Sequence, residues 1–300
     1  MSNRSARQRL KRGDAVGVVA SGFAVDRVPV EAGLERLRRM GFRVRLGDHL
    51  FARQGYLAGN DEQRAADLQA MIRDPEVRAV WFARGGYGTA RILERLPWRL
   101  LARCKKLFIG YSDLTAMFNP LIARTGLVCL YGPVVSELGD GSAFHRPSLQ
   151  AALKGERVSI ATRRRQVLAP GKGRGRLMGG TLSVLAHLCG TRFAPDLRGA
   201  VLFLEDWGEP TYSIDRMLNQ LRSAGAFRAL AGVLLGGFHV PPRTHFPPDR
   251  DFLDVVREYF LPLGVPVVID LPAGHVSRKR TLPLGATAVI DTHAGRLRFG

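Results

Sequence analysis

The chain has 300 residues, 46% of them hydrophobic and 24% charged, which excludes an intrinsically disordered protein. Its net charge of +19 comes mostly from arginines, which are spread along the whole chain. Nucleic-acid-binding proteins usually concentrate their positive charge on one stripe of the surface. We therefore expect neither nucleic acid nor a membrane as a partner. No apolar run approaches the roughly 18 residues of a membrane helix, and residues 1–12 do not have the pattern of a secretory signal. The cysteines are widely spaced, which predicts buried thiols in a reducing, cytoplasmic compartment.

The first half of the chain alternates short apolar runs with amphipathic helical patterns. Strands are predicted at residues 15–20, 42–46, 77–82, 108–109 and 127–131, and helices at residues 29–40, 60–73, 89–96 and 113–124. Such alternation predicts an α/β fold with a parallel sheet and helices on both faces. Ligands bind at the carboxyl ends of the strands in these sheets, and both the loop at residues 84–88 and Ser112 fall there.

The pattern becomes less regular from about Gly132. We expect a first domain at residues 1–135, a linker at residues 136–175 with a short helix at 147–154, and a second domain at residues 176–300. In the second domain the patterns predict helices at residues 179–188 and 213–223, strands at 200–204, 233–235 and 265–269, and a closing hairpin formed by 286–290 and 296–299.

A strand, a sharp turn and a helix are predicted around Ser112. The apolar run before it ends at Gly110, and a helical pattern begins at Asp113. A serine on such a turn is lifted out of the sheet and lies at a helix N-terminus, where free N–H groups favour negative charge. Serine and aspartate are also ordinary N-cap residues, so helix capping is the alternative interpretation.

A serine nucleophile needs a base to take its proton and an acid to orient that base. Among the histidines, His275 is our candidate for the base, because it follows Gly274 just after the predicted strand at 265–269 and glycine allows close approach of other groups. A loop histidine without a catalytic role is the alternative.

The candidate acids are Glu205, Asp206 and Glu209. Glu205 follows the apolar run at residues 201–204, and a carboxylate at a buried strand end needs a partner. That partner is either an arginine or the ring of His275. Nucleophile, acid and base would then follow the chain order of α/β-hydrolases, although the Gly-x-Ser-x-Gly elbow is absent.

Five motifs resemble, in order and spacing, those of the LD-carboxypeptidases, the S66 serine peptidases that remove the terminal D-alanine from muropeptide tetrapeptides. The motifs are Arg84–Gly88, Gly110–Asp113, Gly179–Ser183, Leu204–Arg216 and Gly274–His275. The resemblance covers nearly the whole chain from about residue 10. One departure is Thr181, where the family often has asparagine, and this substitution affects a supporting contact rather than the three catalytic positions.

The resemblance implies that Ser112 is the nucleophile, Glu205 the acid and His275 the base. It implies an oxyanion hole made by the backbone N–H groups of Gly86 and Asp113. It also implies an N-terminal Rossmann-like domain, a C-terminal swivelling β/α domain with the site between the two, a muropeptide substrate and usually a homodimer. It implies no metal and no cofactor.

An exopeptidase must also recognise the free carboxylate of its substrate. Arg84 is our candidate, because a guanidinium pairs with a carboxylate through two hydrogen bonds. A structural arginine that ties the loop to the sheet is an equal alternative. Gly85 and Tyr87 lie in the same loop and complete the predicted substrate-binding set.

Two other functions stay open. The microcin-immunity branch of the same family hydrolyses peptide–nucleotide conjugates, but its members tend to be longer and to carry an added aromatic loop that we do not find here. A non-enzymatic basic protein that binds an anionic polymer rests only on the net charge and on arginine clusters at residues 4–12 and 163–176. A steep salt dependence of binding would identify it.

Overall fold

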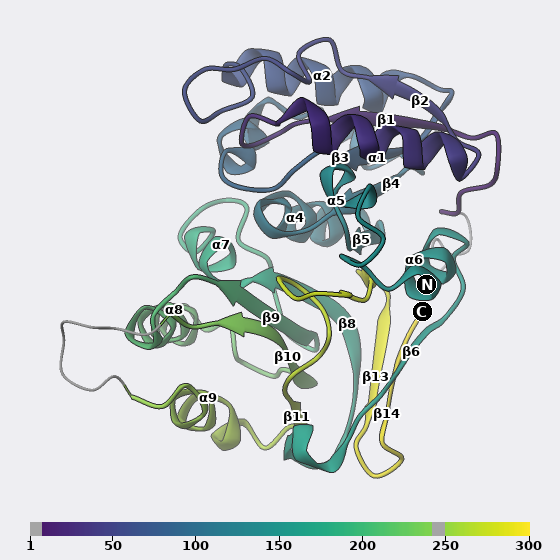
Figure 1. The fold of residues 1–300 in the computed structure, drawn as a ribbon. Coiled ribbons are helices and arrows are strands. Elements are labelled where there is room, and N and C mark those ends of the chain that lie inside the picture. Colours follow the sequence, from purple (N-terminus) through teal and green to yellow (C-terminus); the bar gives the residue numbers. More distant parts are fainter. Residues whose placement is uncertain (1–7, 242–249) are drawn as a thin grey trace.

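Two α/β units, each built around its own sheet, form the computed structural model of the chain, which describes residues 8–241 and 250–300 (Figure 1). In the first unit the strands follow the order β12-β5-β4-β3-β1-β2. These strands are β1 (Ala15–Val19), β2 (Arg43–Leu46), β3 (Val77–Phe82), β4 (Leu107–Gly110), β5 (Cys129–Tyr131) and β12 (Leu282–Leu284). Neighbouring strands run parallel, except that β12 pairs antiparallel with β5.

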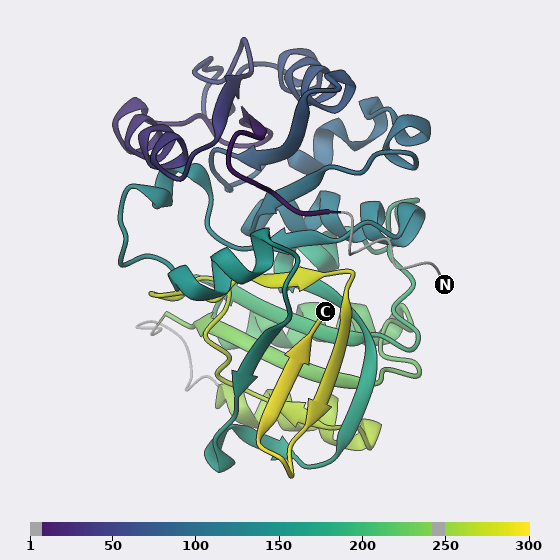
Figure 2. The ribbon, with the colours of Figure 1, turned by 90° about the vertical axis from the view of Figure 1, so that its right-hand side faces the viewer.

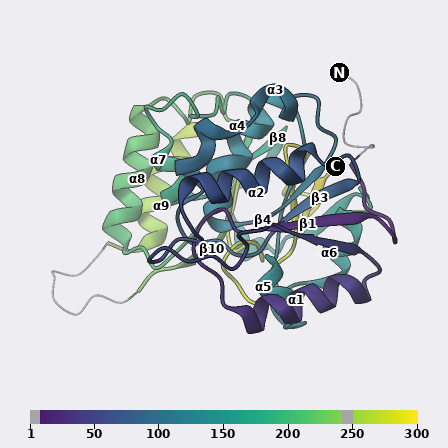
Figure 3. The ribbon, with the colours of Figure 1, turned by 90° about the horizontal axis from the view of Figure 1, so that it is seen from above.

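Helices cover both faces of this first sheet. They are α1 (Arg27–Arg39), α2 (Asp61–Arg73), the 3₁₀ helix η2 (Thr89–Arg95), α3 (Trp98–Leu101), the 3₁₀ helix η3 (Ser112–Leu114), α4 (Thr115–Thr125), α5 (Val135–Leu138) and α6 (Arg146–Leu153). In the view from above, α1 and α5 lie on one side of the strands and α2 and α4 on the other (Figure 3). The predicted α/β fold with a parallel sheet is therefore confirmed.

The sequence explains where these helices begin and which face they bury. Asn60 accepts a hydrogen bond from the Gln63 N–H at 2.8 Å, and the Gln63 side chain accepts one from the Asn60 N–H at 3.0 Å. This reciprocal capping satisfies two N–H groups that have no partner inside α2. Helix α1 buries Val30, Leu34 and Leu37, the apolar stripe that its sequence pattern predicts.

The second sheet follows the order β6-β14-β13-β8-β9-β10-β11-β7. Its strands are β6 (Val158–Ala161), β7 (Val167–Ala169), β8 (Lys172–Thr181), β9 (Val201–Trp207), β10 (Gly232–His239), β11 (Val267–Val268), β13 (Thr287–Asp291) and β14 (Arg296–Phe299). The long strand β8 pairs antiparallel with β13 through residues 172–176 and parallel with β9 through residues 177–181. The sheet curls at this change, so that the antiparallel strands, including the yellow β13 and β14, face the viewer in Figure 2.

Helices α7 (Leu182–His187), α8 (Thr211–Ser223) and α9 (Phe252–Phe260) lie along one face of the parallel strands (Figure 1). The short 3₁₀ helices η4 (Arg164–Gln166) and η5 (Leu261–Leu263) lie in connections. The predicted hairpin at the end of the chain is confirmed, since β13 and β14 pair antiparallel. None of the helices in the described residues combines the length and apolarity of a membrane span.

Several segments differ from the sequence-based expectation. The segment 136–175 contains α6, β6, η4, β7 and the start of β8, which is more regular structure than a linker needs. The helix predicted at residues 179–188 begins only at Leu182, so its predicted start is wrong. Gly179 and Gly180 belong to β8 and have φ values of 115° and 135°. A side chain on Gly179 would overlap the main-chain oxygen of Phe203 on the paired strand, and glycine is required there for close approach rather than for a turn.

Strand β12 was not predicted, and it joins the two units. It follows the loop that carries His275, leaves the second unit, and pairs with β5 at the edge of the first sheet. The chain that carries His275 is therefore anchored in both sheets, by β11 before the loop and by β12 after it.

Candidate active site

Ser112 lies in the turn between β4 and α4. Its backbone is in the left-handed region, with a φ of 66°, a conformation that costs a residue with a β-carbon roughly 1–3 kcal/mol. Its N–H donates a hydrogen bond to the Tyr131 hydroxyl at 3.2 Å. A serine held in this strained conformation after a strand is the arrangement that presents a hydroxyl as a nucleophile.

The loop at residues 84–88 lies directly against Ser112. A β-carbon at Gly85 would be 2.9 Å from Ser112 Cβ and 3.2 Å from its Oγ, so the approach is too close for another residue type. The loop follows β3 and Ser112 follows β4, and these strands are parallel neighbours. The glycine loop and Ser112 thus meet at the carboxyl ends of two adjacent strands.

Glu205 and His275 form a hydrogen-bonded pair. The Glu205 side chain is fully buried on β9, and its Oε2 accepts hydrogen bonds from His275 Nδ1 at 2.7 Å and from the His275 N–H at 2.9 Å. Because a carboxylate only accepts, the proton lies on Nδ1, and Nε2 is left as the free, basic nitrogen. Gly274 makes this possible, since a side chain there would overlap the Glu205 carboxylate.

The second oxygen of Glu205 connects the pair to the nucleophile turn. Glu205 Oε1 accepts hydrogen bonds from the Tyr131 hydroxyl at 2.6 Å and from the Thr181 hydroxyl at 2.6 Å. Tyr131 in turn accepts the bond from Ser112. The Thr181 N–H also donates a hydrogen bond to Thr115 Oγ1 on α4 at 3.0 Å. Sequence reasoning missed Tyr131, although it ends a predicted strand beside Ser112.

The pair shifts the protonation of both partners. Burial lowers the pKa of His275, but the hydrogen bond and the negative charge of Glu205 more than offset burial, so the pKa of His275 is raised. Burial raises the pKa of Glu205, but the hydrogen bond and charge of His275, together with the bonds from Thr181 and Tyr131, lower it below its usual value. Glu205 is therefore ionised and His275 is a stronger base than a free imidazole.

The other two candidate acids lie elsewhere. Asp206 accepts hydrogen bonds from the Ser183 N–H at 2.7 Å and the Trp207 N–H at 2.8 Å rather than from the His275 ring. Burial raises the pKa of Asp206 to about 6. Glu209 lies in the connection after β9. Of the three carboxylates, Glu205 is the one that bonds the His275 ring.

A buried ion pair lies next to His275. Lys279 Nζ is 2.5 Å from Glu137 Oε1, which also accepts a hydrogen bond from the Tyr111 hydroxyl at 2.8 Å. The Tyr111 ring centroid is 4.9 Å from that of His275. Tyr111 precedes Ser112, so this cluster joins the nucleophile turn to the His275 loop. Sequence reasoning missed it because its members are far apart in the chain.

Exposed side chains border the site on both sides. Arg84 donates a hydrogen bond to the Ala24 carbonyl at 3.1 Å and lies over the Phe23 ring, which fits the structural alternative without excluding carboxylate binding. Tyr87 is 46% exposed. On the other side, the Trp207 ring stacks on His239 at 4.1 Å and lies 6.1 Å from His275. The roles predicted for Arg84, Gly85, Gly86 and Tyr87 stay predictions.

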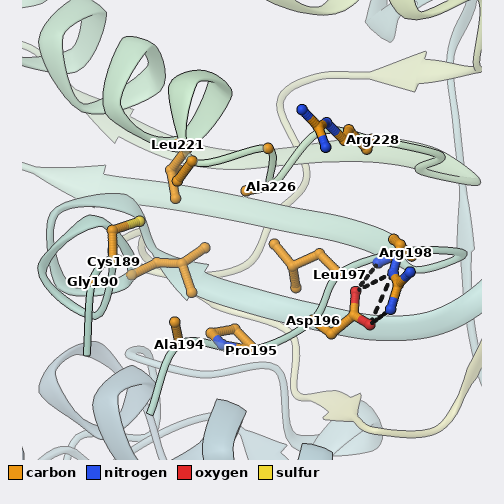
Figure 4. Close-up of a pocket in the computed structure, with 13 residues that line it drawn as sticks. Cys189, Gly190, Ala194, Pro195, Asp196, Leu197, Arg198, Leu221, Ala226 and Arg228 are labelled. Atoms are coloured by element: carbon orange, nitrogen blue, oxygen red, sulfur yellow. Dashed lines mark hydrogen bonds and ion pairs between the residues drawn. The ribbon is translucent and has the colours of Figure 1, made fainter. Parts of the chain in front are cut away.

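A separate pocket of about 360 Å³ lies between α7 and α8 (Figure 4). Leu185, Cys189 and Leu221 line its apolar wall. In its wall Arg198 pairs with Asp196 at 2.6 Å, and Arg228 also lines the pocket. Across residues 8–241 and 250–300, no group of three or more His, Cys, Asp or Glu side chains is placed to hold a metal ion.

Comparison with known families agrees with this geometry. A family model described as the LD-carboxypeptidase N-terminal domain matches residues 16–132, and one described as the LD-carboxypeptidase C-terminal domain matches residues 174–290. The chain is 38% identical over 277 residues to the probable murein peptide carboxypeptidase of Bacillus subtilis, covering 89% of this chain and 86% of that protein. It is 35% identical over 279 residues to the murein tetrapeptide carboxypeptidase of Pseudomonas aeruginosa, covering 88% and 89%.

Solved structures give the same result. The muramoyltetrapeptide carboxypeptidase from Oxalobacter formigenes superposes with a TM-score of 0.86 at 31% identity, covering 95% of this chain and 98% of that chain. The microcin C7 self-immunity protein MccF of Escherichia coli is more distant, at 25% identity over 241 residues. The chain therefore belongs to the LD-carboxypeptidase family, peptidase family S66, and is a carboxypeptidase of that family.

Proposed function

We propose that this protein is a serine-type LD-carboxypeptidase that removes the C-terminal D-alanine from muropeptide tetrapeptides, in the cytoplasm and during peptidoglycan recycling. The observation that carries the proposal is the Glu205–His275 pair, which is linked through Tyr131 to a strained Ser112. The names of the relatives from B. subtilis and P. aeruginosa support a murein peptide as substrate.

The proposed reaction begins with proton transfer from Ser112. The free Nε2 of His275 takes the proton while Ser112 Oγ attacks the carbonyl carbon between the L-centre and the terminal D-alanine. Glu205 stays ionised and stabilises the imidazolium that forms. His275 then gives the proton to the leaving amine of D-alanine, and water hydrolyses the acyl-enzyme by the same route in reverse.

Negative charge develops on the carbonyl oxygen during the attack. We assign its stabilisation to the backbone N–H groups of Gly86 and Asp113, which belong to the two loops that meet at Ser112. One such donor is worth roughly 3 kcal/mol of barrier in serine proteases. Arg84, with Gly85 and Tyr87 beside it, is proposed to bind the substrate's free carboxylate.

The test is incubation of the purified protein with an L,D-tetrapeptide and with the matched D,D-pentapeptide, followed by mass detection of released alanine. We expect release from the tetrapeptide alone. Tetrapeptides with lysine and with diaminopimelate at the third position would identify the preferred diamino acid. A Ser112→Ala variant should fold normally and lose roughly 10⁶ in kcat.

Two results would overturn the proposal. One is a Ser112→Ala variant within tenfold of the wild type. The other is hydrolysis of an aminoacyl sulfamoyl nucleoside without hydrolysis of the tetrapeptide, which would place the protein in the microcin-immunity branch.

We also propose a homodimer, which sedimentation equilibrium tests directly.

A further inference from the structure

A buried cation lies beneath the glycine loop at residues 84–88. The Arg64 side chain on α2 is fully buried, and its Nη1 donates hydrogen bonds to the Ser21 carbonyl at 2.6 Å and to the Gly88 carbonyl at 3.0 Å. Its Nη2 pairs with Asp61. Burying a guanidinium is unfavourable unless its donors are used, and here two of them are used on main-chain carbonyls beside the loop.

A buried carboxylate holds the same part of the loop from the other side. Asp113 Oδ2 accepts a hydrogen bond from the Thr89 N–H at 2.9 Å. The Thr89 hydroxyl is 2.8 Å from that of Ser21. Gly22 leaves room for this contact, since a β-carbon there would lie 2.7 Å from Asp113 Oδ2. Burial raises the pKa of Asp113, while the hydrogen bonds from Thr89 and the positive charge of Arg64 act in the opposite direction.

The loop needs such support because its glycines are conformationally free. Gly86 and Gly88 have φ values of 109° and 135°, which other residues rarely adopt. A β-carbon at Gly88 would lie 2.7 Å from Arg64 Nη1, so the arginine packs directly against the loop. Arg64 fixes the carbonyl of residue 88 and Asp113 fixes the N–H of residue 89, which leaves the end of the loop one orientation.

Asp113 contributes to the proposed oxyanion hole in two ways. Its backbone N–H is one proposed oxyanion donor, and its side chain holds the loop that supplies the other donor, Gly86. We propose that Arg64 and the Asp113 side chain are positioning residues that set the distance between the two oxyanion donors. This inference rests on the proposed function. Both side chains are buried, so we expect their effect to fall on the stabilisation of the charge that develops in the transition state rather than on substrate binding.

The experiment compares Arg64→Met and Arg64→Lys with the wild type on the tetrapeptide. A peptidyl boronate with boron in place of the scissile carbonyl carbon serves as a transition-state analogue, and the tripeptide product reports ground-state binding. For Arg64→Met we expect kcat to fall about 10²–10³-fold, as when one oxyanion donor is lost, with KM within about threefold. Boronate affinity should fall with kcat, and tripeptide affinity should stay unchanged. Arg64→Lys can keep one carbonyl bond, so it should recover part of kcat.

Arg95→Gln is the matched control, because Arg95 on η2 pairs at 2.7 Å with Glu62 on α2, the helix that carries Arg64, but its side chain is exposed. It should leave kcat unchanged. If Arg64→Met does not fold, Arg64→Lys and Asp113→Asn decide. Asp113→Asn keeps an oxygen acceptor but removes the charge opposite Arg64, and should lower kcat and boronate affinity together.

Unchanged kcat in a folded Arg64→Met variant would overturn the inference, and so would an equal loss of tripeptide and boronate affinity. A wild type that neither hydrolyses the tetrapeptide nor binds the boronate would instead refute the proposed function, so the two failures are distinguishable.

Discussion

Two carboxylate–histidine pairs in this molecule have nearly the same geometry. In one, Glu205 binds the N–H and Nδ1 of His275, and in the other, Asp67 binds the N–H and Nδ1 of His49, at 2.9 Å and 2.8 Å. Each carboxylate is buried, and each lies against a glycine whose side chain would overlap it, Gly274 in the first pair and Gly47 in the second.

The pairs differ in how the carboxylate oxygens are used. Asp67 uses a separate oxygen for each bond to His49, so both are occupied locally and the pair closes the loop after β2 onto α2. Glu205 binds His275 with one oxygen and keeps the other for Tyr131 and Thr181. Tyr131 then reaches Ser112. A carboxylate–histidine pair can thus fix a loop without further connections, and we propose that the link to Ser112 marks the pair that takes part in the reaction.

The sharpest test of this contrast replaces each of the two histidines by glutamine, one at a time. His275→Gln removes the proposed general base, so we expect kcat on the tetrapeptide to fall by up to roughly 10⁶. His49→Gln should leave kcat unchanged and lower Tm by a few degrees. Steady-state kinetics and thermal unfolding of both variants check this. Comparable activity losses in the two variants would show that the pairs are not functionally different.

The carboxylates give the next largest effect. Glu205→Gln should lower kcat about 10⁴-fold, because an amide no longer holds the imidazole in its active tautomer. Asp67→Asn should keep kcat while lowering the free energy of unfolding by about 1–3 kcal/mol, which denaturant titration measures.

The Asp206→Asn variant tests whether Glu205 or its neighbour on β9 is the acid. Asp206 bonds Ser183 and Trp207 rather than His275, so its variant should retain most activity. An inactive Asp206→Asn beside an active Glu205→Gln would move the acid assignment by one residue.

The pH profile distinguishes the pairs without a change in the catalytic residues. In the proposed mechanism neutral His275 is the active base, so kcat/KM should rise about tenfold per pH unit below its raised pKa and level off above it. The same shift means that protonated His275 stabilises the fold below the ordinary histidine pKa of about 6.5, and that this stability is lost as pH rises through the raised pKa. His49→Gln should leave the rate profile in place. A wild-type profile that is flat between about pH 5 and 8 would exclude a histidine base.

A smaller loss of activity is expected when the link that only one pair has is broken. Tyr131→Phe removes the hydroxyl between Ser112 and Glu205 but keeps the ring that packs on Phe203. Because Thr181 still bonds Glu205, we expect kcat to fall only about tenfold, as for loss of one hydrogen bond to a charged group. An unchanged kcat would mean that the link is structural.

Local patterns predicted much of the fold and the key candidates. The strands and helices of the first unit follow from apolar alternation and from the Asn60 cap, because these signals act within a few residues. The resemblance and the chain order pointed to Ser112, Glu205 and His275. Their hydrogen bonds in the structure agree with that choice, while their catalytic roles stay predictions.

Contacts between distant segments could not be predicted in this way. The start of α7 was misplaced because Gly179 is needed by its pairing with β9, which the local sequence does not show. Tyr131, Lys279 and Arg64 look like ordinary strand, loop and helix residues in the sequence. Their importance comes from partners that the fold brings to them, such as Glu137 for Lys279, which lies 142 positions away in the chain.

The late position of β12 in the chain has a consequence for biosynthesis. The edge of β5 is complete early in synthesis, but its partner β12 follows His275, near the end of the chain. At about 5–20 residues per second, this edge waits on the order of ten seconds for its partner, and an unpaired edge strand is a template for aggregation. A nascent chain that has not yet reached β12 therefore holds Ser112 on a sheet whose edge strand β5 is unpaired, and a chain that stops before residue 275 also lacks the proposed base.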